Sequence, residues 1–462
     1  MRGAATKRAH TGGETLRDER ELRAIADNVL RLAKLRGVKE AEVNVEEVID
    51  ALTRFANNAI HQNVAEHGLS VSIRTVVDGR TARVTTNRVD EDSLRAALEN
   101  SLAMAASQPK DAKLLPLPGK QKYRALQRFV GATAALTAEE RARAVKRACD
   151  LADKRGQMAA GIFQSGQSQT VLCNSRGLFA AYRQTQAEFS VTMQQGAAAS
   201  WAKANAADVR AIDPIGLAKK ASEKAERAQN PVELAPGRYT VILEPAAVLD
   251  LVGFLFYDFA ATAVEDKRSC FSGRLGKTLF GKSITITDDV YHPEQLGPQF
   301  DGEGMPRQRV VLVDKGMLCN LVYSRRSAKA AHVKPTGHGF ALPNEYGEAA
   351  MNLVIAGGSS PVEEMVRTTE RGLLVTRLWY IREVDPYEKV MTGMTRDGLF
   401  LVERGQIGRG VRNFRFNQSI LQMLSNVEML GPSRRASGEE SFEMVVPPMK
   451  IREFQFSEVT KF

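Results

Sequence analysis

Residues 68–86, GLSVSIRTVVDGRTARVTT, contain the clearest fold signal in the sequence. Apolar and polar side chains alternate on both sides of Asp78-Gly79, as expected for two strands that each bury one face. An Asp-Gly pair readily adopts the positive φ angles that a tight hairpin turn needs. The stretch therefore predicts an antiparallel hairpin within a sheet-forming region.

Helical patterns surround this hairpin. Apolar positions recur at helical spacing from Leu16 to Leu35, and residues 90–106 form an amphipathic segment that begins with acidic residues. Thr137 and Glu140 match a capping box, which predicts a helix up to about Lys154. Strand-like segments follow to about residue 194, and a further helix is expected at roughly 206–226.

The second half of the chain consists mostly of short strands and turns. VVLVDKGML (310–318) and LFLVERGQI (399–407) each indicate a strand, a turn and a returning strand. Asp397-Gly398 predicts a turn between two more strands, and SILQMLSNVEML (419–430) has a helical apolar stripe.

These patterns predict an α+β protein with two domains. We expect an N-terminal sheet-and-helix domain at residues 15–235, with a proline-rich connector at about 108–124, and a β-rich C-terminal domain with a few helices at 236–462. Residues 1–14 are expected to form a disordered tail.

The composition indicates a soluble cytoplasmic protein. The chain has 462 residues, 43% of them apolar, and no apolar run reaches the roughly 18 residues that a membrane-spanning helix needs. The N-terminus lacks the apolar segment of a secretory signal. Four cysteines without CxxC pairing (Cys149, Cys173, Cys270 and Cys319) favour a reducing compartment.

The net charge of +10 does not by itself indicate nucleic-acid binding. Basic residues are interleaved with acidic ones, as in REVDPYEKV, and there is no polybasic tract or RNA-binding signature. Nucleic acid is therefore not an expected partner.

No catalytic residue can be assigned from the residue pattern alone. None of the six histidines belongs to an HExxH pair, and neither a GxSxG elbow nor a P-loop is present. Two segments supply candidate substrate-binding residues. The first is the acidic loop FDGEGMP with Asp301 and Glu303, which could equally be a turn with two solvated acids. The second is YSRRSAKAAHVKPTGHGF, which predicts a basic loop with Arg325 and Arg326 that leads to His338.

Residues 251–261, LVGFLFYDFAA, are almost entirely apolar and follow Glu244-Pro245. At about 100° per residue, Asp250, Phe254 and Asp258 fall on one stripe, which predicts a core helix with one semi-polar edge.

The order of several segments resembles that of the TldD/PmbA family, also called TldD/TldE. DGEGMP with VVLVDKGML, YSRRSAKAAHVKPTGHG, MNLVIAGG, GLLVTRLWY, RDGLFLVERGQI and LQMLSNVEMLG occur in the family order. EHGLSVSIRTVVDGRTARV and VLCNSRGLFAAYRQTQAEFSV are similar to its N-terminal signatures, so the resemblance extends from about residue 20 to the end. It implies a two-subunit peptidase acting on unfolded peptides, in which a TldD-like subunit binds zinc through HExxxH and a distant cysteine.

The position that the resemblance assigns to HExxxH reads GFLFYD here, residues 253–258. Gly253 and Asp258 replace the histidines and Phe254 replaces the glutamate, while no cysteine follows Cys319. One carboxylate provides too few ligands for zinc. The resemblance therefore implies a non-catalytic TldE/PmbA-like subunit that binds no metal or other cofactor and assigns no catalytic residue, with zinc in a TldD-like partner and unfolded or extended peptides as ligands.

Two other functions remain open from the sequence. One is an autonomous peptidase that uses Asp301 and Glu303 with His338 for acid–base chemistry. The other is a regulatory binding protein, because the family has also carried a gyrase-modulator label. Whether the chain is itself an enzyme is left undecided at this point.

Overall fold

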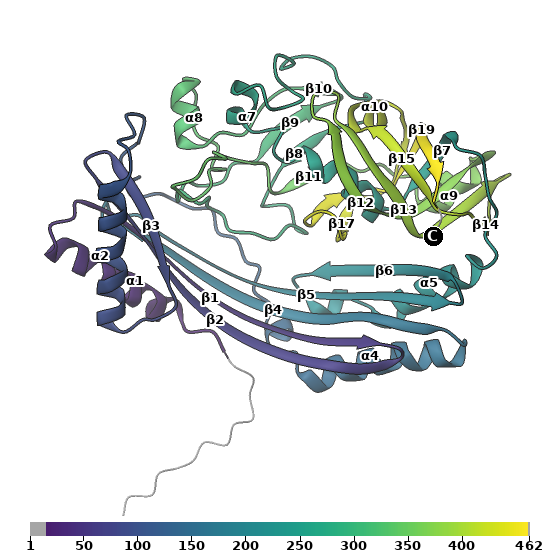
Figure 1. Ribbon diagram of the computed structural model, residues 1–462, viewed down its shortest axis with the longest axis horizontal. Coiled ribbons are helices and arrows are strands. Elements are labelled where there is room, and N and C mark those ends of the chain that lie inside the picture. Colours follow the sequence, from purple (N-terminus) through teal and green to yellow (C-terminus); the bar gives the residue numbers. More distant parts are fainter. Residues whose placement is uncertain (1–14, 461–462) are drawn as a thin grey trace, which may run out of the picture.

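The computed structural model describes residues 15–460 and contains one long curved sheet in the first half of the chain and two sheets in the second half (Figure 1). The predicted α+β class is confirmed, with sheet and helices first and a strand-rich half afterwards. The expected disordered tail at 1–14 lies outside the described residues. Within the described range, no helix combines the length and apolarity needed to cross a bilayer.

The first sheet is antiparallel throughout, with the strand order β3-β2-β1-β4-β5-β6. Its elements are α1 (Glu19–Leu35), β1 (Glu40–Ala56), β2 (Ala59–Val77), β3 (Arg80–Thr86), α2 (Glu91–Ser107), α3 (Gly131–Ala134), α4 (Ala138–Lys154), β4 (Met158–Asn174), β5 (Phe179–Gln195), β6 (Ala198–Ala206), the 3-10 helix η1 (Val209–Ala211) and α5 (Pro214–Arg227).

Local chemistry explains the elements that were predicted well. The β2–β3 hairpin turns at Asp78 and Gly79, whose φ angles are +49° and +75°. The capping box of Thr137 and Glu140 begins α4. The last helix of this half begins later than predicted, at Pro214, because β6 continues to Ala206 in the sheet and Asp213 then caps the helix.

The two faces of the first sheet have different neighbours. Helices α1 and α2 bury apolar side chains on one face at one end of the sheet, and α4 and α5 do so at the other end. The opposite face, called here the inner face, is turned toward the second half of the chain (Figure 1). Contacts such as Gly297 N donating to Gln184 Oε1 at 3.1 Å join that face to the second half.

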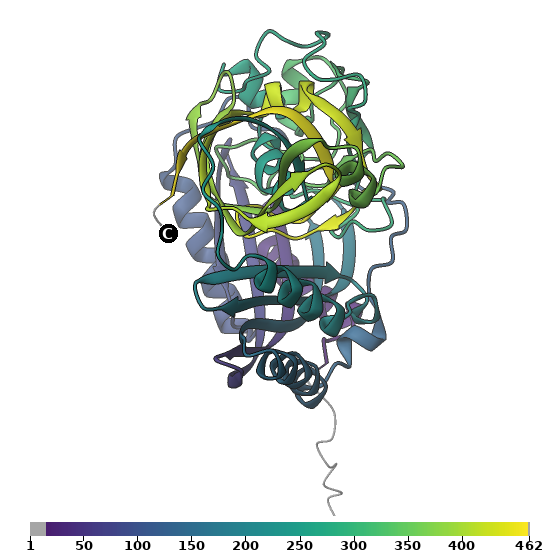
Figure 2. The ribbon, with the colours of Figure 1, turned by 90° about the vertical axis from the view of Figure 1, so that its right-hand side faces the viewer.

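The second half contains two six-strand paths, β10-β9-β8-β11-β18-β17 and β12-β7-β19-β15-β13-β14. In the second path, an additional pairing of β12 with β13 closes the strands from β12 to β13 into a ring, and β16 joins this sheet by pairing with β19 (Figure 2). The elements are β7 (Gly237–Leu243), α6 (Pro245–Val252), the 3-10 helix η2 (Gly253–Leu255), α7 (Ala261–Glu265), β8 (Ile286–Asp288), β9 (Val310–Asp314), β10 (Met317–Leu318), α8 (Arg325–Ala330), β11 (Leu353–Ile355), α9 (Val362–Arg367), β12 (Arg371–Asp385), β13 (Val390–Glu403), β14 (Gln406–Gly410), β15 (Phe414–Ser419), α10 (Ile420–Ser425), β16 (Val427–Leu430), β17 (Arg434–Ala436), β18 (Met444–Val446) and β19 (Met449–Val459).

Two predictions in this half were wrong because distant strands determine the local structure. Asp397-Gly398 is not a turn but lies inside β13, where Asp397 forms an ion pair with Arg377 of β12. The helix predicted at 419–430 ends at Ser425, because residues 427–430 pair with β19 instead.

A buried ion pair connects the two halves of the chain. Lys224 of α5 donates to Glu244, the residue just before α6, and to Thr376 of β12. Burial opposes the charge of Glu244, but Lys224 and Lys220 outweigh it and lower the pKa of Glu244 to about 2. Lys224 is largely buried, whereas the side chain of Lys220 is 54% exposed.

Replacing Lys224→Met should lower the free energy of unfolding by about 3 kcal/mol, because Glu244 then keeps only one exposed cation beside its buried charge. Lys220→Met is the matched control and should cost less than about 1 kcal/mol. Urea unfolding at neutral pH measures both. Equal losses for the two variants would show that burial of the pair has no special role.

Candidate functional site

Residues 251–261 do not form the single core helix that was predicted. Helix α6 ends at Val252, residues 253–255 form the 3-10 helix η2, and the chain then turns up to Ala260. The last turn of a helix often tightens in this way. The backbone next pairs with Val322, which donates to Phe259 O and accepts from Ala261 N. Asp250, Phe254 and Asp258 therefore do not share one helical stripe.

Gly253 lies where no larger residue fits in this structure. A Cβ atom at this position would lie 1.9 Å from Ser441 Oγ. Ser441 belongs to the segment 437–443, and residues 439–442 of this segment line a cavity of about 380 Å³ together with Gly253, Phe254 and Phe256. The Phe442 ring packs edge-on against Phe256, with 5.3 Å between ring centroids. An imidazole at Gly253 would clash with this segment.

Asp258 is buried, and protein groups surround its carboxylate. Oδ1 accepts the N–H of Cys270 at 2.9 Å, and Oδ2 lies 2.5 Å from Lys389 Nζ. Lys389 also lies 2.6 Å from Glu383. Burial disfavours the lysine charge, but the two carboxylates outweigh burial and raise the pKa of Lys389. Lys389 therefore balances the negative charge of Asp258.

This set of groups does not fit a zinc ion. Glycine and phenylalanine offer no donor atoms, and the one carboxylate is held in an ion pair. Across residues 15–460, no group of three or more His, Cys, Asp or Glu side chains is arranged to hold a metal.

The acidic loop at 300–306 is buried, unlike a turn with solvated acids. Asp301 Oδ1 accepts the N–H groups of Glu303 and Met305 at 2.9 and 2.8 Å, and Oδ2 accepts that of Gly339 at 2.8 Å. Burial raises the pKa of Asp301, while these N–H groups oppose that rise. Three backbone donors on one carboxylate show that Asp301 organises the loop.

Glu303 has a different environment. It is 4% exposed and accepts the N–H of Arg325 at 2.9 Å. Burial, followed by the nearby Asp301, raises the pKa of Glu303 to about 7. Its side chain also lines a cavity of about 660 Å³ between α7, α8 and the segment 112–115.

His338 does not join the two acids in a shared acid–base group. Its Nε2 lies 2.9 Å from Asp288 Oδ1, and its Nδ1 lies 2.9 Å from Thr336 Oγ1. Asp288 also accepts the N–H of Asn352. Burial opposes the charge of Asp288, but His338 outweighs it and lowers the pKa of the carboxyl. Both ring nitrogens are thus engaged in a buried structural network.

The predicted basic loop is a helix. Ser324 caps α8 through reciprocal contacts with Ser327, so Arg325 and Arg326 lie in the first helical turn. Arg325 donates to Pro116 O at 2.7 Å, and Arg326 pairs with Asp111 at 2.9 Å. Both arginines therefore hold the proline-rich connector against the second half.

Sequence reasoning missed two residues that define this region, Lys389 and Ser441. Lys389 lies just before β13 and has a positive φ of +51°, and Ser441 lies between short strands. Neither belongs to a recognisable motif, and both act through contacts with a distant part of the chain. No local signal could have identified them.

Three family models match consecutive segments of the chain. The PmbA/TldA metallopeptidase domain 1 matches residues 41–105, the central domain matches 132–229, and the C-terminal domain matches 236–458.

Curated relatives are distant. Metalloprotease PmbA of Escherichia coli O157:H7 is 26% identical over 316 residues, 65% of this chain and 66% of that protein. A metalloprotease of Methanothermobacter thermautotrophicus is 23% identical over 230 residues, 47% of this chain and 48% of that protein. The chain thus spans about half to two thirds of the length of these relatives.

Solved structures share the fold over nearly the whole chain. TldE from Thermococcus kodakarensis gives a TM-score of 0.86 at 20% identity, covering 94% of this chain and 100% of that one. A Thermotoga maritima protein named as a candidate modulator of a DNA gyrase gives 0.84 at 21% identity, with coverage of 94% and 100%. Because the family models match from residue 41 to residue 458 in order, and these folds agree, the chain belongs to the PmbA/TldD metallopeptidase family.

Proposed function

We propose that this chain is the non-catalytic, TldE/PmbA-like subunit of a two-subunit metallopeptidase. In this proposal a TldD-like partner holds the zinc and hydrolyses unfolded or extended peptides, and this chain forms part of the wall around the substrate. The observation that carries the proposal is the environment of residues 253–258: Ser441 fills the space beside Gly253, and Lys389 neutralises Asp258.

The comparison with zinc peptidase chemistry supports this proposal. A catalytic zinc site needs three protein ligands and a base for the bound water. Here the positions assigned to those groups are a glycine, a phenylalanine and a carboxylate that is already paired with a lysine. A cytoplasmic location is part of the proposal, because the four described cysteines are free.

The geometry gives less support to an autonomous peptidase that uses Asp301 and Glu303 with His338, here called the acidic alternative. Asp301 is held by three backbone N–H groups, and His338 is engaged by Asp288 and Thr336. Of these three residues, Glu303 is the one that both lines a cavity and has a raised pKa. The gyrase-modulator names belong to other proteins of this fold, and no feature of the described residues favours that function for this chain.

The isolated chain should bind zinc only substoichiometrically and should not hydrolyse peptides, whereas the complex with a TldD-like subunit should hydrolyse them until a chelator is added. Elemental analysis and a fluorogenic peptide assay measure these properties. The double variant Asp258→Asn/Lys389→Met removes both charges together and should leave hydrolysis by the complex intact. Stoichiometric zinc in the isolated chain, or hydrolysis by it that resists chelation, would overturn the proposal.

Glu303→Gln distinguishes a buried structural carboxyl from an acid–base residue. Because the pKa of Glu303 rises from 4.5 to about 7 on folding, the folded state keeps its proton where the unfolded chain has lost it. The wild-type chain should therefore lose stability relative to the variant between about pH 4.5 and pH 7, by about 3 kcal/mol in total. Urea unfolding at pH 4.5, 6 and 8 measures the difference.

Peptide hydrolysis by the complex is the second measurement made on Glu303→Gln. If Glu303 is structural, the complex that contains Glu303→Gln keeps its activity. A complete loss of peptide hydrolysis with an intact complex would instead favour the acidic alternative.

A further inference from the structure

Among residues 15–460, no second strand pairs with the first half of β2 on the side away from β1. Residues 59–69 pair with β1 on one side, while β3 reaches only Val71–Val77 on the other. Most of this stretch is exposed. Natural edge strands usually carry prolines, lysines or bulges that prevent further pairing. This edge has no proline or lysine, and its one register irregularity in the β1 pairing lies at His61, before the regular run of residues 62–69. An extended chain could therefore add to residues 62–69 through backbone hydrogen bonds.

A row of side chains crosses the inner face of the sheet from this edge. Glu66 of β2 is directly opposite Asp50 of β1, Asp50 is opposite Gly166 of β4, and Gly166 is opposite Gln186 of β5. Directly opposed residues of antiparallel strands share one face. Asp50 Oδ1 would lie 2.3 Å from a Cβ at residue 166, so the carboxylate depends on glycine for its place above β4.

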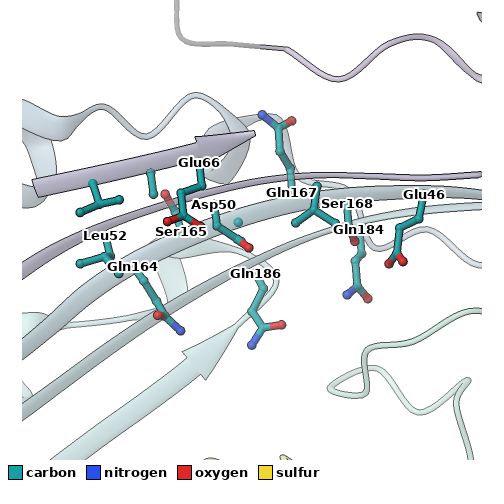
Figure 3. A pocket seen from close by; sticks show the side chains of 14 residues that line it. Glu46, Asp50, Leu52, Glu66, Gln164, Ser165, Gln167, Ser168, Gln184 and Gln186 are labelled. Atoms are coloured by element: carbon teal, nitrogen blue, oxygen red, sulfur yellow. The ribbon is translucent and has the colours of Figure 1, made fainter. Parts of the chain in front are cut away.

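This row lines a cavity of about 500 Å³ on the inner face. In Figure 3 the Asp50 and Glu66 side chains lie together, and those of Gln164 and Gln186 project from the neighbouring strands on the same side of the sheet. The amides can donate to or accept from a polar main chain, and the carboxylates can only accept.

The charge of the cavity has no counterpart among the described residues. Glu46, Asp50 and Glu66 make neither a salt bridge nor a side-chain hydrogen bond within residues 15–460, although the whole chain carries +10. Like charges on directly opposed residues are destabilising. Consistent with this, burial and the facing Glu66 raise the pKa of Asp50. A cation placed beside the two acids would remove their repulsion.

We infer that the free half of β2 accepts an extended polypeptide by strand addition, and that Glu66 and Asp50 select a lysine or arginine side chain at the position opposite Glu66. On an added strand, the residue opposite Glu66 projects onto the inner face directly beside Glu66, and a long cationic side chain there can extend across β2 toward Asp50. This inference rests on the proposed function, because it defines the class of peptide that the subunit receives.

The test measures binding of fluorescein-labelled extended octapeptides to the full isolated chain by anisotropy. Three peptides share a Thr/Val/Ser sequence and differ at one central position, which is Lys, Gln or Glu. The Lys peptide should bind about three- to fivefold more tightly than the Gln peptide, the scale of a favourable cross-strand charge pair, and the Glu peptide should bind most weakly. The preference should decrease as salt is added.

Asp50→Asn/Glu66→Gln should abolish the preference for Lys without loss of folding, because both changes are isosteric and remove a repulsion. Glu223→Gln/Glu226→Gln is the matched control, since it removes two exposed acids of α5 and should keep the preference. Methylating alternate backbone nitrogens of the Lys peptide should weaken binding, because strand addition needs those donors.

Equal affinity for the three peptides, or a preference for Lys that survives Asp50→Asn/Glu66→Gln, would overturn the inference. A self-associated chain that peptide does not dissociate in sedimentation analysis would do the same, since a second copy would then occupy the edge. Complex formation with a TldD-like subunit is measured separately by native mass spectrometry. An intact complex without Lys selection refutes only this inference, whereas failure to form the complex refutes the proposed function.

Discussion

The buried contact between Asp258 and Lys389 constrains the region that the family resemblance assigns to metal. A carboxylate removed from water needs an opposite charge or several hydrogen-bond donors. Here Lys389 supplies the charge and Cys270 supplies a backbone N–H. The pair connects the turn after η2 to the start of β13, and Ser441 closes the other side against Gly253. Lys389 thus compensates the buried charge of Asp258, while Glu383, the second carboxylate beside Lys389, is partly exposed to solvent.

Elements set by nearby residues could be predicted from the sequence. The β2–β3 hairpin follows from Asp78-Gly79, and the start of α4 follows from Thr137 and Glu140. Some elements whose backbone partners are distant could not. Residues 427–430 leave the predicted helix to pair with β19, and Asp397-Gly398 remains in β13 through its contacts with β12. Periodicity describes a segment by itself and does not indicate which strand competes for its backbone.

The same distinction applies to the candidate site. The identities of Gly253, Phe254 and Asp258 could be read from the sequence, and the resemblance indicated where to look. The groups that fill and neutralise that position, Ser441 and Lys389, became visible only in three dimensions. Asp301 shows the opposite case: a loop that looked suited to solvent is buried, because its carboxylate accepts three backbone N–H groups that folding would otherwise leave without acceptors.

The acids of the inner face differ from these paired carboxylates. Asp258 and Glu244 each face a lysine, and Asp301 is surrounded by N–H donors, so each serves the fold. Asp50 and Glu66 instead face each other and contribute repulsion to the folded state. The chain has many basic residues, and one of them at a neighbouring strand position would remove this repulsion. Keeping these two acids without a nearby cation lowers the stability of the folded chain. A bound peptide that pairs with β2 through its backbone and places a cation beside Glu66 would restore that stability.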